Sequence, residues 1–302
     1  MIMVSKIFEW FQSQSFEKCT KFYEQSGSEI SVIEKYFIAI SYLFLEKYIE
    51  SQQLLTEIKS QRSKLPDYHT YVALNYLKLG DVKKSKYYLD QEVNNSQLLY
   101  FETNIEVTLK LGQLVRLKRL LDQSEKNGCR SINIEINKAI YFKLKHNYLE
   151  AEQILLKLFS KDPDNDIIID NLVKIYIASR QSEKSIQLLV QVIKRKPKEL
   201  KYLWKLALEY SFEGKHKQLE EMMKKVEAVD PALINIRRIL TIPSVYDGCD
   251  QQNRYREMIE THLDIIESKN LFPNEPNRSV AATPFFLAYH NASNKNILVR
   301  IA

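Results

Sequence analysis

Residues 163–231 decide the fold, and they read PDNDIIIDNLVKIYIASRQSEKSIQLLVQVIKRKPKELKYLWKLALEYSFEGKHKQLEEMMKKVEAVDP. Three prolines, Pro163, Pro197 and Pro231, divide this stretch into equal parts, because each follows the one before by 34 residues (163 to 197, and 197 to 231). Between them, apolar residues recur at the spacing of amphipathic helices. A fixed period of this length indicates a chain built from stacked helix pairs.

Other positions recur when each repeat is numbered so that its proline is position 32. Positions 8 and 20 hold mostly small residues, which allow two helices to approach closely, and positions 11 and 24 hold larger ones that fill the space beyond. In three successive repeats, positions 8, 11, 20 and 24 are occupied by Ala139, Val173 and Ala207; Phe142, Tyr176 and Tyr210; Ala151, Ser185 and Leu219; and Leu155, Leu189 and Met223.

Position 15 marks a tight turn between the two helices of a repeat. Gly80, Gly112 and Gly214 occupy it in three repeats, and His146 and Arg180 occupy it in two others. The whole pattern resembles the tetratricopeptide consensus, which implies an all-α fold, a right-handed superhelical solenoid of helix-turn-helix repeats with a non-repeat C-terminal cap or linker. We expect a degenerate helix pair in residues 1–31, about six repeats in 32–234, and a helical cap or linker with an irregular tail in 235–302.

The composition disfavours several classes of function. Lys and Arg number 44 against 38 Asp and Glu, and the two signs are interspersed along the chain, so nucleic acid is not an expected partner. The 5 histidines and 3 cysteines show no metal-ligand spacing, and the chain has neither a glycine-rich phosphate loop nor a GxSxG nucleophile motif. We therefore expect no metal, no cofactor and no enzyme activity in this chain.

The N-terminus has no apolar core and no cleavage site of a signal peptide. The longest apolar run, residues 36–45, is about half as long as a membrane span. The three cysteines lie far apart, which favours a reducing compartment over a disulfide framework. We therefore expect a cytoplasmic protein that does not enter a membrane.

The inner face of such a stack is formed by the first helix of each repeat, at positions 2, 5, 6, 9, 12 and 13. Position 6 holds Asn137 and Asn171 in two repeats. An asparagine there can hydrogen-bond both the N–H and the C=O of an extended peptide, although the two are equally explained as ordinary exposed polar residues. We predict a scaffold that binds a protein or extended peptide on this face. The candidate residues are Asn137, Asn171, Lys174, Lys201, Trp204, Lys205, Leu208 and Phe212.

Three of the candidates, Asn171, Lys201 and Lys205, resemble part of the dicarboxylate clamp with which some tetratricopeptide cochaperones hold acidic chaperone C-termini. The family has Lys and Asn where this chain has Ile136 and Ile140, so half of the donors to a carboxylate are missing and no clamp is predicted. The inner positions are otherwise apolar, which suits an amphipathic helix of a partner or the chain's own tail. These apolar residues are Tyr36, Ile40, Leu74, Leu77, Ile136, Ile140, Ile177, Trp204 and Phe212.

After Pro231 the repeat stops. Residues 251–268 read as one amphipathic helix, with Tyr255, Ile259, Leu263 and Ile266 on one face. Residues 271–283 read as an irregular loop, and the apolar stretch 283–290 reads as a buried strand or an extended docking segment.

Two stretches of the tail, RRILTIPSVYDGCDQQNRYREMIETHLDII (237–266) and TPFFLAYHNASNKNIL (283–298), resemble a particular linker. It joins the repeats to the catalytic region in bacterial SPINDLY-like and O-GlcNAc-transferase-like glycosyltransferases. A glycine and an Asn-Asp pair commonly follow the histidine there, whereas Asn291 follows it here. The matching residues are Pro243, Tyr246, Arg254, Arg256, Phe286, Leu287, Ala288, Tyr289 and His290.

This second resemblance implies an alternative function. The chain would be the substrate-binding N-terminal part of a glycosyltransferase whose nucleotide-sugar-binding lobes lie outside it, or a relative that keeps only the scaffold. Without such lobes, residues 284–289 would form an exposed apolar patch. We expect that patch to fold back on the last helices or to mediate self-association.

Overall fold

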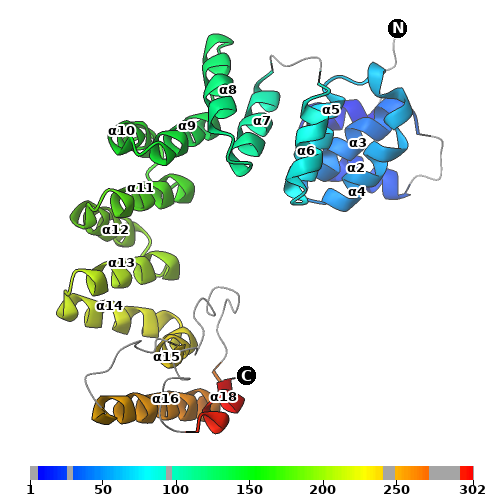
Figure 1. Cartoon of the computed structure of the whole chain (residues 1–302). Helices are drawn as coiled ribbons and strands as arrows, with labels where there is room; N and C mark the ends of the chain where they lie inside the picture. Colours follow the sequence, from blue (N-terminus) through cyan, green and yellow to red (C-terminus); the bar gives the residue numbers. More distant parts are fainter. Residues whose placement is uncertain (1–5, 26–29, 93–96, 241–248, 272–292, 302) are drawn as a thin grey trace. The chain divides into compact units, whose positions relative to one another are not determined.

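The computed structural model describes residues 6–25, 30–92, 97–240, 249–271 and 293–301, and every regular element in these ranges is helical (Figure 1). The chain divides into two compact units, an N-terminal unit of residues 1–171 and a C-terminal unit of residues 172–302. The N-terminal unit contains α1 (Lys6–Gln12), α2 (Phe16–Gln25), α3 (Val32–Phe44), α4 (Tyr48–Glu57), the 3-10 helix η1 (Lys59–Lys64), α5 (Tyr68–Lys78), α6 (Val82–Leu89), α7 (Leu98–Lys110), α8 (Leu114–Lys126), α9 (Ile132–Leu144) and α10 (Tyr148–Phe159).

The division between the units falls within α11 (Asp166–Ala178). The C-terminal unit continues with α12 (Ser182–Arg195), α13 (Leu200–Phe212), α14 (His216–Val229), α15 (Pro231–Leu240), α16 (Cys249–Lys269) and α18 (Lys295–Ile301). The fold is all-α, as the repeat pattern predicts.

One turn geometry joins the helices of each pair. The second residue after the first helix adopts a left-handed backbone, and the residue that follows it donates its N–H to a carbonyl five residues back, as in a Schellman motif. Gln113 N donates to Thr108 O at 3.1 Å, and Gln181 N donates to Tyr176 O at 2.8 Å. The five predicted turn residues all show this positive φ, and so do Gln14 and Glu46 in the first two pairs. The angles are 56° (Gln14), 61° (Glu46), 86° (Gly80), 67° (Gly112), 59° (His146), 56° (Arg180) and 64° (Gly214).

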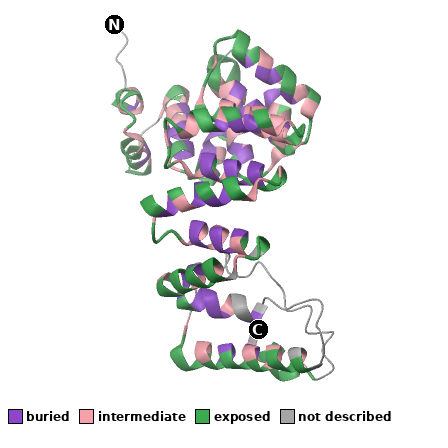
Figure 2. Cartoon of the chain, turned by 90° about the vertical axis from the view of Figure 1, so that its left-hand side faces the viewer, coloured by how far each residue is buried: buried purple, intermediate pink, exposed green. Residues whose placement is uncertain are grey.

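Small side chains lie where the two helices of a pair cross. Ala139 and Ala151 are buried, and so is Ser185. Ser85, at the same position in an earlier pair, donates its hydroxyl to the carbonyl of Ala73 at 2.7 Å, so its burial leaves no polar atom unpaired. In Figure 2 the buried residues line the sides on which helices pack together, and exposed residues cover the opposite sides.

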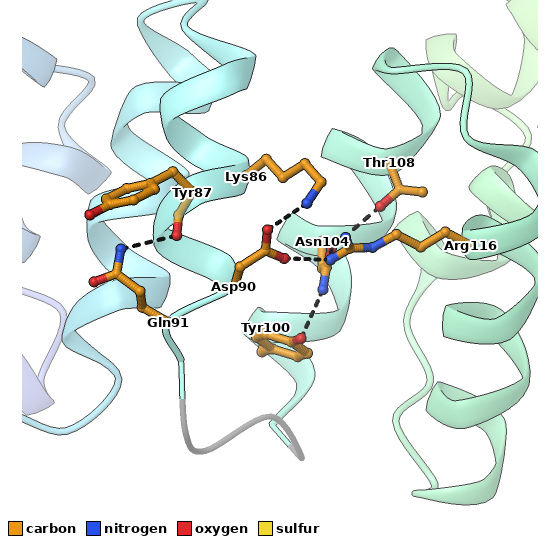
Figure 3. A network of polar contacts seen from close by, with 8 residues as sticks. All are labelled: Lys86, Tyr87, Asp90, Gln91, Tyr100, Asn104, Thr108 and Arg116. Atoms are coloured by element: carbon orange, nitrogen blue, oxygen red, sulfur yellow. Dashed lines mark hydrogen bonds and ion pairs between the residues drawn. The ribbon is translucent and has the colours of Figure 1, made fainter.

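A polar network holds α6, α7 and α8 together at the point where the spacing between turn glycines falls to 32 residues (Gly80 to Gly112) (Figure 3). Its centre is Asn104, which is 1% exposed. The Asn104 amide donates to the Tyr100 hydroxyl at 2.9 Å, and its oxygen accepts from Thr108 at 3.3 Å and Arg116 at 3.4 Å. A buried amide with partners for both of its ends costs little stability.

The last helices form a cap that does not follow the repeat. The predicted helix over 251–268 is α16, and its apolar face packs with α15 and α18 through Ile239, Ile259, Leu263 and Ile297. Arg300 on α18 donates to Glu267 at 2.7 Å and to Asp264 at 2.6 Å, both on α16. The predicted loop beyond Leu271, the segment 283–290, Pro243 and Tyr246 lie outside the described residues.

Candidate protein-binding surface

Four of the first helices in the N-terminal unit, α3, α5, α7 and α9, line a hollow of about 290 Å³. Nine of its lining residues occupy the positions predicted to form the inner face, and the other two, Glu46 and Tyr48, belong to the turn and the next helix. We call this cavity the acidic hollow. It is lined by Leu43, Phe44, Glu46, Tyr48, Leu74, Lys78, Leu99, Glu102, Thr103, Glu106 and Asn133.

The acidic hollow combines apolar side chains with carboxylates. Glu102 on α7 is held against the start of α9, because its Oε1 accepts from the Ser131 hydroxyl at 2.6 Å and from the Asn133 amide at 3.3 Å. Glu106, one helical turn further along α7, forms an ion pair with Lys110 at 3.3 Å. The surface therefore offers carboxylates that are partly fixed in place beside exposed carbon surface.

The two asparagines predicted to bind a peptide backbone differ in their surroundings. Asn137 on α9 is half-buried. Asn171 on α11 is only 7% exposed, and its amide donates to the carbonyl of Ile167 in the same helix at 2.9 Å. The Asn171 donor is thus engaged with its own helix backbone.

Several apolar residues predicted to line the groove belong to the core instead. Tyr36, Ile40, Leu77 and Ile136 are buried. The Tyr36 hydroxyl donates to the carbonyl of Pro66, and burial raises its pKa above the ordinary tyrosine value. These residues pack adjacent helix pairs together, so they present no surface to a partner.

In the C-terminal unit, the two lysines of the clamp resemblance lie close to one aromatic ring. The Nζ of Lys201 lies 4.7 Å from the centroid of the Tyr202 ring, and the Nζ of Lys205 lies 5.9 Å from it. Tyr202 itself is fully buried. At these distances a lysine is attracted to the face of the ring, which fixes part of each side chain.

The remaining candidates give the C-terminal unit exposed carbon surface at inner-face positions. Phe212 is 82% exposed and Leu208 is 40% exposed on α13, where Trp204 is half-buried. Lys174 is exposed on α11, and Ile177 on the same helix is 54% exposed. Exposed aromatic and aliphatic side chains on one side of a protein are typical of interaction surfaces.

The carboxylates of the acidic hollow were not among the predicted site residues. Glu102 and Glu106 occupy positions 5 and 9 of α7, the helix whose turn glycine is Gly112. Both glutamates occupy inner positions that the repeat register identifies, but the prediction considered only asparagines, lysines and apolar residues at such positions. Within the described residues, no three His, Cys, Asp or Glu side chains are grouped so as to hold a metal ion. No helix in those ranges has the length and apolar character that a membrane span requires.

No protein-family model matches the sequence, and no curated protein has a significantly similar sequence. Solved structures are similar in fold. A tetratricopeptide repeat protein from Parabacteroides merdae ATCC 43184 aligns with a TM-score of 0.55 and 13% identity, over 86% of this chain and 97% of that chain. A chain of the APC/C hetero-tetramer Cut9-Hcn1 aligns with a TM-score of 0.57 and 11% identity, over 85% of this chain and 48% of that one.

The fold is that of a tetratricopeptide repeat protein. At these identities the similarity concerns the fold alone. The tetratricopeptide arrangement explains why the acidic hollow is lined from equivalent positions of α3, α5, α7 and α9, since each pair repeats the geometry of the one before.

Proposed function

We propose that this chain is a non-catalytic scaffold that binds a segment of another protein on the inner face of its helix pairs. The observation that carries the proposal is the acidic hollow, because four successive first helices contribute to a single cavity. A cavity assembled from equivalent positions of a repeat suits an elongated ligand that runs across the helices.

The exposed apolar residues of the C-terminal unit support the same proposal. Phe212 is 82% exposed, and Ile177 and Leu208 expose large parts of their side chains at inner positions. Burying such side chains against a partner contributes favourable free energy at roughly 25 cal/mol per Å² of apolar surface. The APC/C chain of similar fold comes from a hetero-tetramer, and we infer that the partner here is likewise a protein.

The test uses peptides selected from a random library on the purified full chain. Their affinities are then measured for the wild type, for the inner-face variants Phe212→Ala and Leu99→Ala, and for Val115→Ala, which removes an exposed side chain from a second helix. We expect each peptide to lose affinity for at least one inner-face variant and to bind Val115→Ala as it binds the wild type. Peptides that respond only to Val115→Ala would contradict the proposal, as would a failure to select any peptide.

A finer version of this function comes from the resemblance of the tail to glycosyltransferase linkers. Part of the match, Pro243, Tyr246 and residues 286–290, lies outside the described residues, so this version rests on the sequence. In it, the inner face would hold an acceptor polypeptide for catalytic lobes beyond this chain. The intact mass of the native protein tests it: a species much larger than 35.6 kDa would support it, and a species of that mass would contradict it. Light scattering over a concentration series tests the predicted self-association through residues 284–289.

A further inference from the structure

We propose that the acidic hollow receives a lysine or arginine side chain from a basic segment of the partner protein. This inference rests on the proposed function and specifies the chemistry of the segment that is bound. Both parts of such a side chain, its apolar stem and its cationic end, have counterparts in the hollow.

The stem is matched by the apolar part of the lining. Leu43, Phe44, Leu74 and Leu99 come from three helices, and Phe44 is 49% exposed although it is a large aromatic residue. Lysine and arginine side chains bury their methylene groups along apolar surface while the charged end reaches polar groups. An aliphatic or aromatic anchor would fill the apolar part equally well, so the charges decide between these ligands.

The charges in the hollow favour a cation. Three glutamates, Glu46, Glu102 and Glu106, line it together with one lysine, Lys78. The chain as a whole has a net charge of +6, so the local excess of carboxylates is opposite in sign to the protein's overall charge. Neither Glu46 nor Lys78 forms an ion pair with another residue in the described part of the chain.

Glu102 and Glu106 lie four residues apart on α7 and therefore share one side of the helix. Like charges at this spacing repel, and a cation placed beside both relieves the repulsion. Lys110 already pairs with Glu106, but both side chains are well exposed, and such pairs contribute little to stability. An incoming guanidinium or ammonium group can therefore share Glu106 at small cost.

Glu102 is preorganised for this contact. Ser131 and Asn133, at the start of α9, both donate to its Oε1. Within the described residues, no hydrogen bond to its second oxygen, Oε2, is present. A carboxylate that is already fixed loses less conformational entropy on binding, so more of the interaction energy contributes to affinity.

The experiment starts from the peptides selected on the full chain. In each peptide, every arginine is replaced in turn by citrulline, its neutral isostere, and every lysine by norleucine. Affinities are measured for the wild type, Glu102→Gln and Glu106→Gln, with Glu17→Gln on α2 as a control that removes an exposed carboxylate far along the chain from the hollow. Glu102→Gln replaces the carboxylate that accepts from Ser131, whereas Glu106→Gln leaves that contact intact. A loss of affinity in both variants therefore cannot be explained by a local structural change at Glu102.

We expect one cationic position per peptide to matter, and its neutralisation to weaken binding about ten-fold. Glu102→Gln and Glu106→Gln should weaken binding of the parent peptide to a similar degree. They should hardly change the affinity of the neutralised peptide, which is the signature of direct coupling between the glutamates and the cation. Glu17→Gln should change the affinity of neither peptide. The coupled part of the affinity should also decrease as salt is added.

Two outcomes would overturn this inference and leave the proposed function standing. Selected peptides that depend on Phe212 or Leu99 but lack a coupled cationic residue would show an apolar ligand. Equal losses of affinity for Glu17→Gln and for the two hollow variants would show non-specific electrostatic attraction between peptide and protein. A third outcome would overturn the inference by identifying a second copy of the chain as the occupant: a change in self-association, measured by light scattering on Glu102→Gln and Glu106→Gln without peptide. If no peptide depends on any inner-face residue, the proposed function fails together with this inference.

Discussion

The guanidinium of Arg116 lies 2.9 Å from the carboxylate of Asp90 (Nη2 to Oδ1), so the second helix of one pair is joined to the end of the second helix of the pair before it. Lys86 pairs with the same carboxylate. Burial by itself would raise the pKa of Asp90, but the hydrogen bonds from Lys86 and Arg116 outweigh it and hold the pKa below its usual value. The ionised carboxylate therefore contributes to the stability of the fold.

Asp90→Asn should lower the free energy of unfolding at pH 7 by about 0.2–1 kcal/mol, since the pair is partly exposed and screened by solvent. Because the folded-state pKa is lowered, this contribution is present above the unfolded-state pKa of about 3.9 and is lost as the pH falls through the folded-state pKa. Urea unfolding at several pH values should show the two proteins converging in acid. Asp122→Asn is the control, because Asp122 pairs with Lys118 within α8 and the substitution removes an ion pair that does not join two helices. A deficit in Asp90→Asn that persists unchanged in acid would exclude the electrostatic explanation.

The turn glycines allow a test of backbone strain without a packing change. Gly112 has a φ of 67°, and a β-carbon added there would meet no heavy atom within 4 Å. Gly112→Ala should therefore cost about 1 kcal/mol through the left-handed backbone alone. Gly112→Asn should cost less, because asparagine tolerates this conformation. Arg180 has a φ of 56° at the equivalent turn, so Arg180→Gly should not destabilise the protein. Equal losses for the alanine and asparagine variants, measured by urea unfolding, would argue against the strain account.

The period of the sequence was sufficient to predict the helix pairs and their turns, because those features depend on local pattern. Helix crossings need small residues such as Ala139 and Ala151, and tight turns need residues that accept a positive φ, so both appear in the sequence at fixed intervals. The turn at Arg180 was identified by its register, since arginine has no special preference for that backbone.

The binding surface was harder to predict, because it depends on how each pair is rotated against the next. Tyr36, Leu77 and Ile136 occupy inner-face positions, yet packing between pairs buries them. Asn171 was selected for its amide, which is engaged with the carbonyl of Ile167. The acidic hollow involves four helices that are far apart in sequence, so no single repeat contains its pattern.

The aromatic residues at position 11 should differ in their importance for stability according to burial. Tyr176 is 5% exposed, whereas Tyr210 at the same position two helices later is only partly buried. We expect Tyr176→Ala to cost about 3–5 kcal/mol and Tyr210→Ala to cost less. Tyr176→Phe keeps the ring and serves as the control for its packing. Urea unfolding of the three variants gives the comparison, and a larger loss for Tyr210→Ala would contradict the observed burial.

Glu209 on α13 is a carboxyl group placed where charge is unfavourable. The residue is 5% exposed. Burial, opposed in part by the Ser185 hydroxyl and reinforced by the charge of Glu213, raises the pKa of its carboxyl above the usual glutamate value. The folded state then holds the proton more tightly than the unfolded state does. Stability is therefore greatest below the unfolded-state pKa of about 4.3, decreases as the pH rises towards the folded-state pKa, and levels off above it.

Glu209→Gln removes this titration and keeps the size of the side chain. We expect the variant to have a higher thermal midpoint than the wild type at pH 7 and the same midpoint at about pH 4, where the wild-type carboxyl is protonated in the fold. Glu227→Gln, an exposed glutamate on α14, should change neither value. Calorimetry from pH 4 to pH 8 measures the difference. A Glu209→Gln protein less stable than the wild type at pH 7 would mean that the ionised carboxylate stabilises the fold, and that its pKa is lowered and not raised.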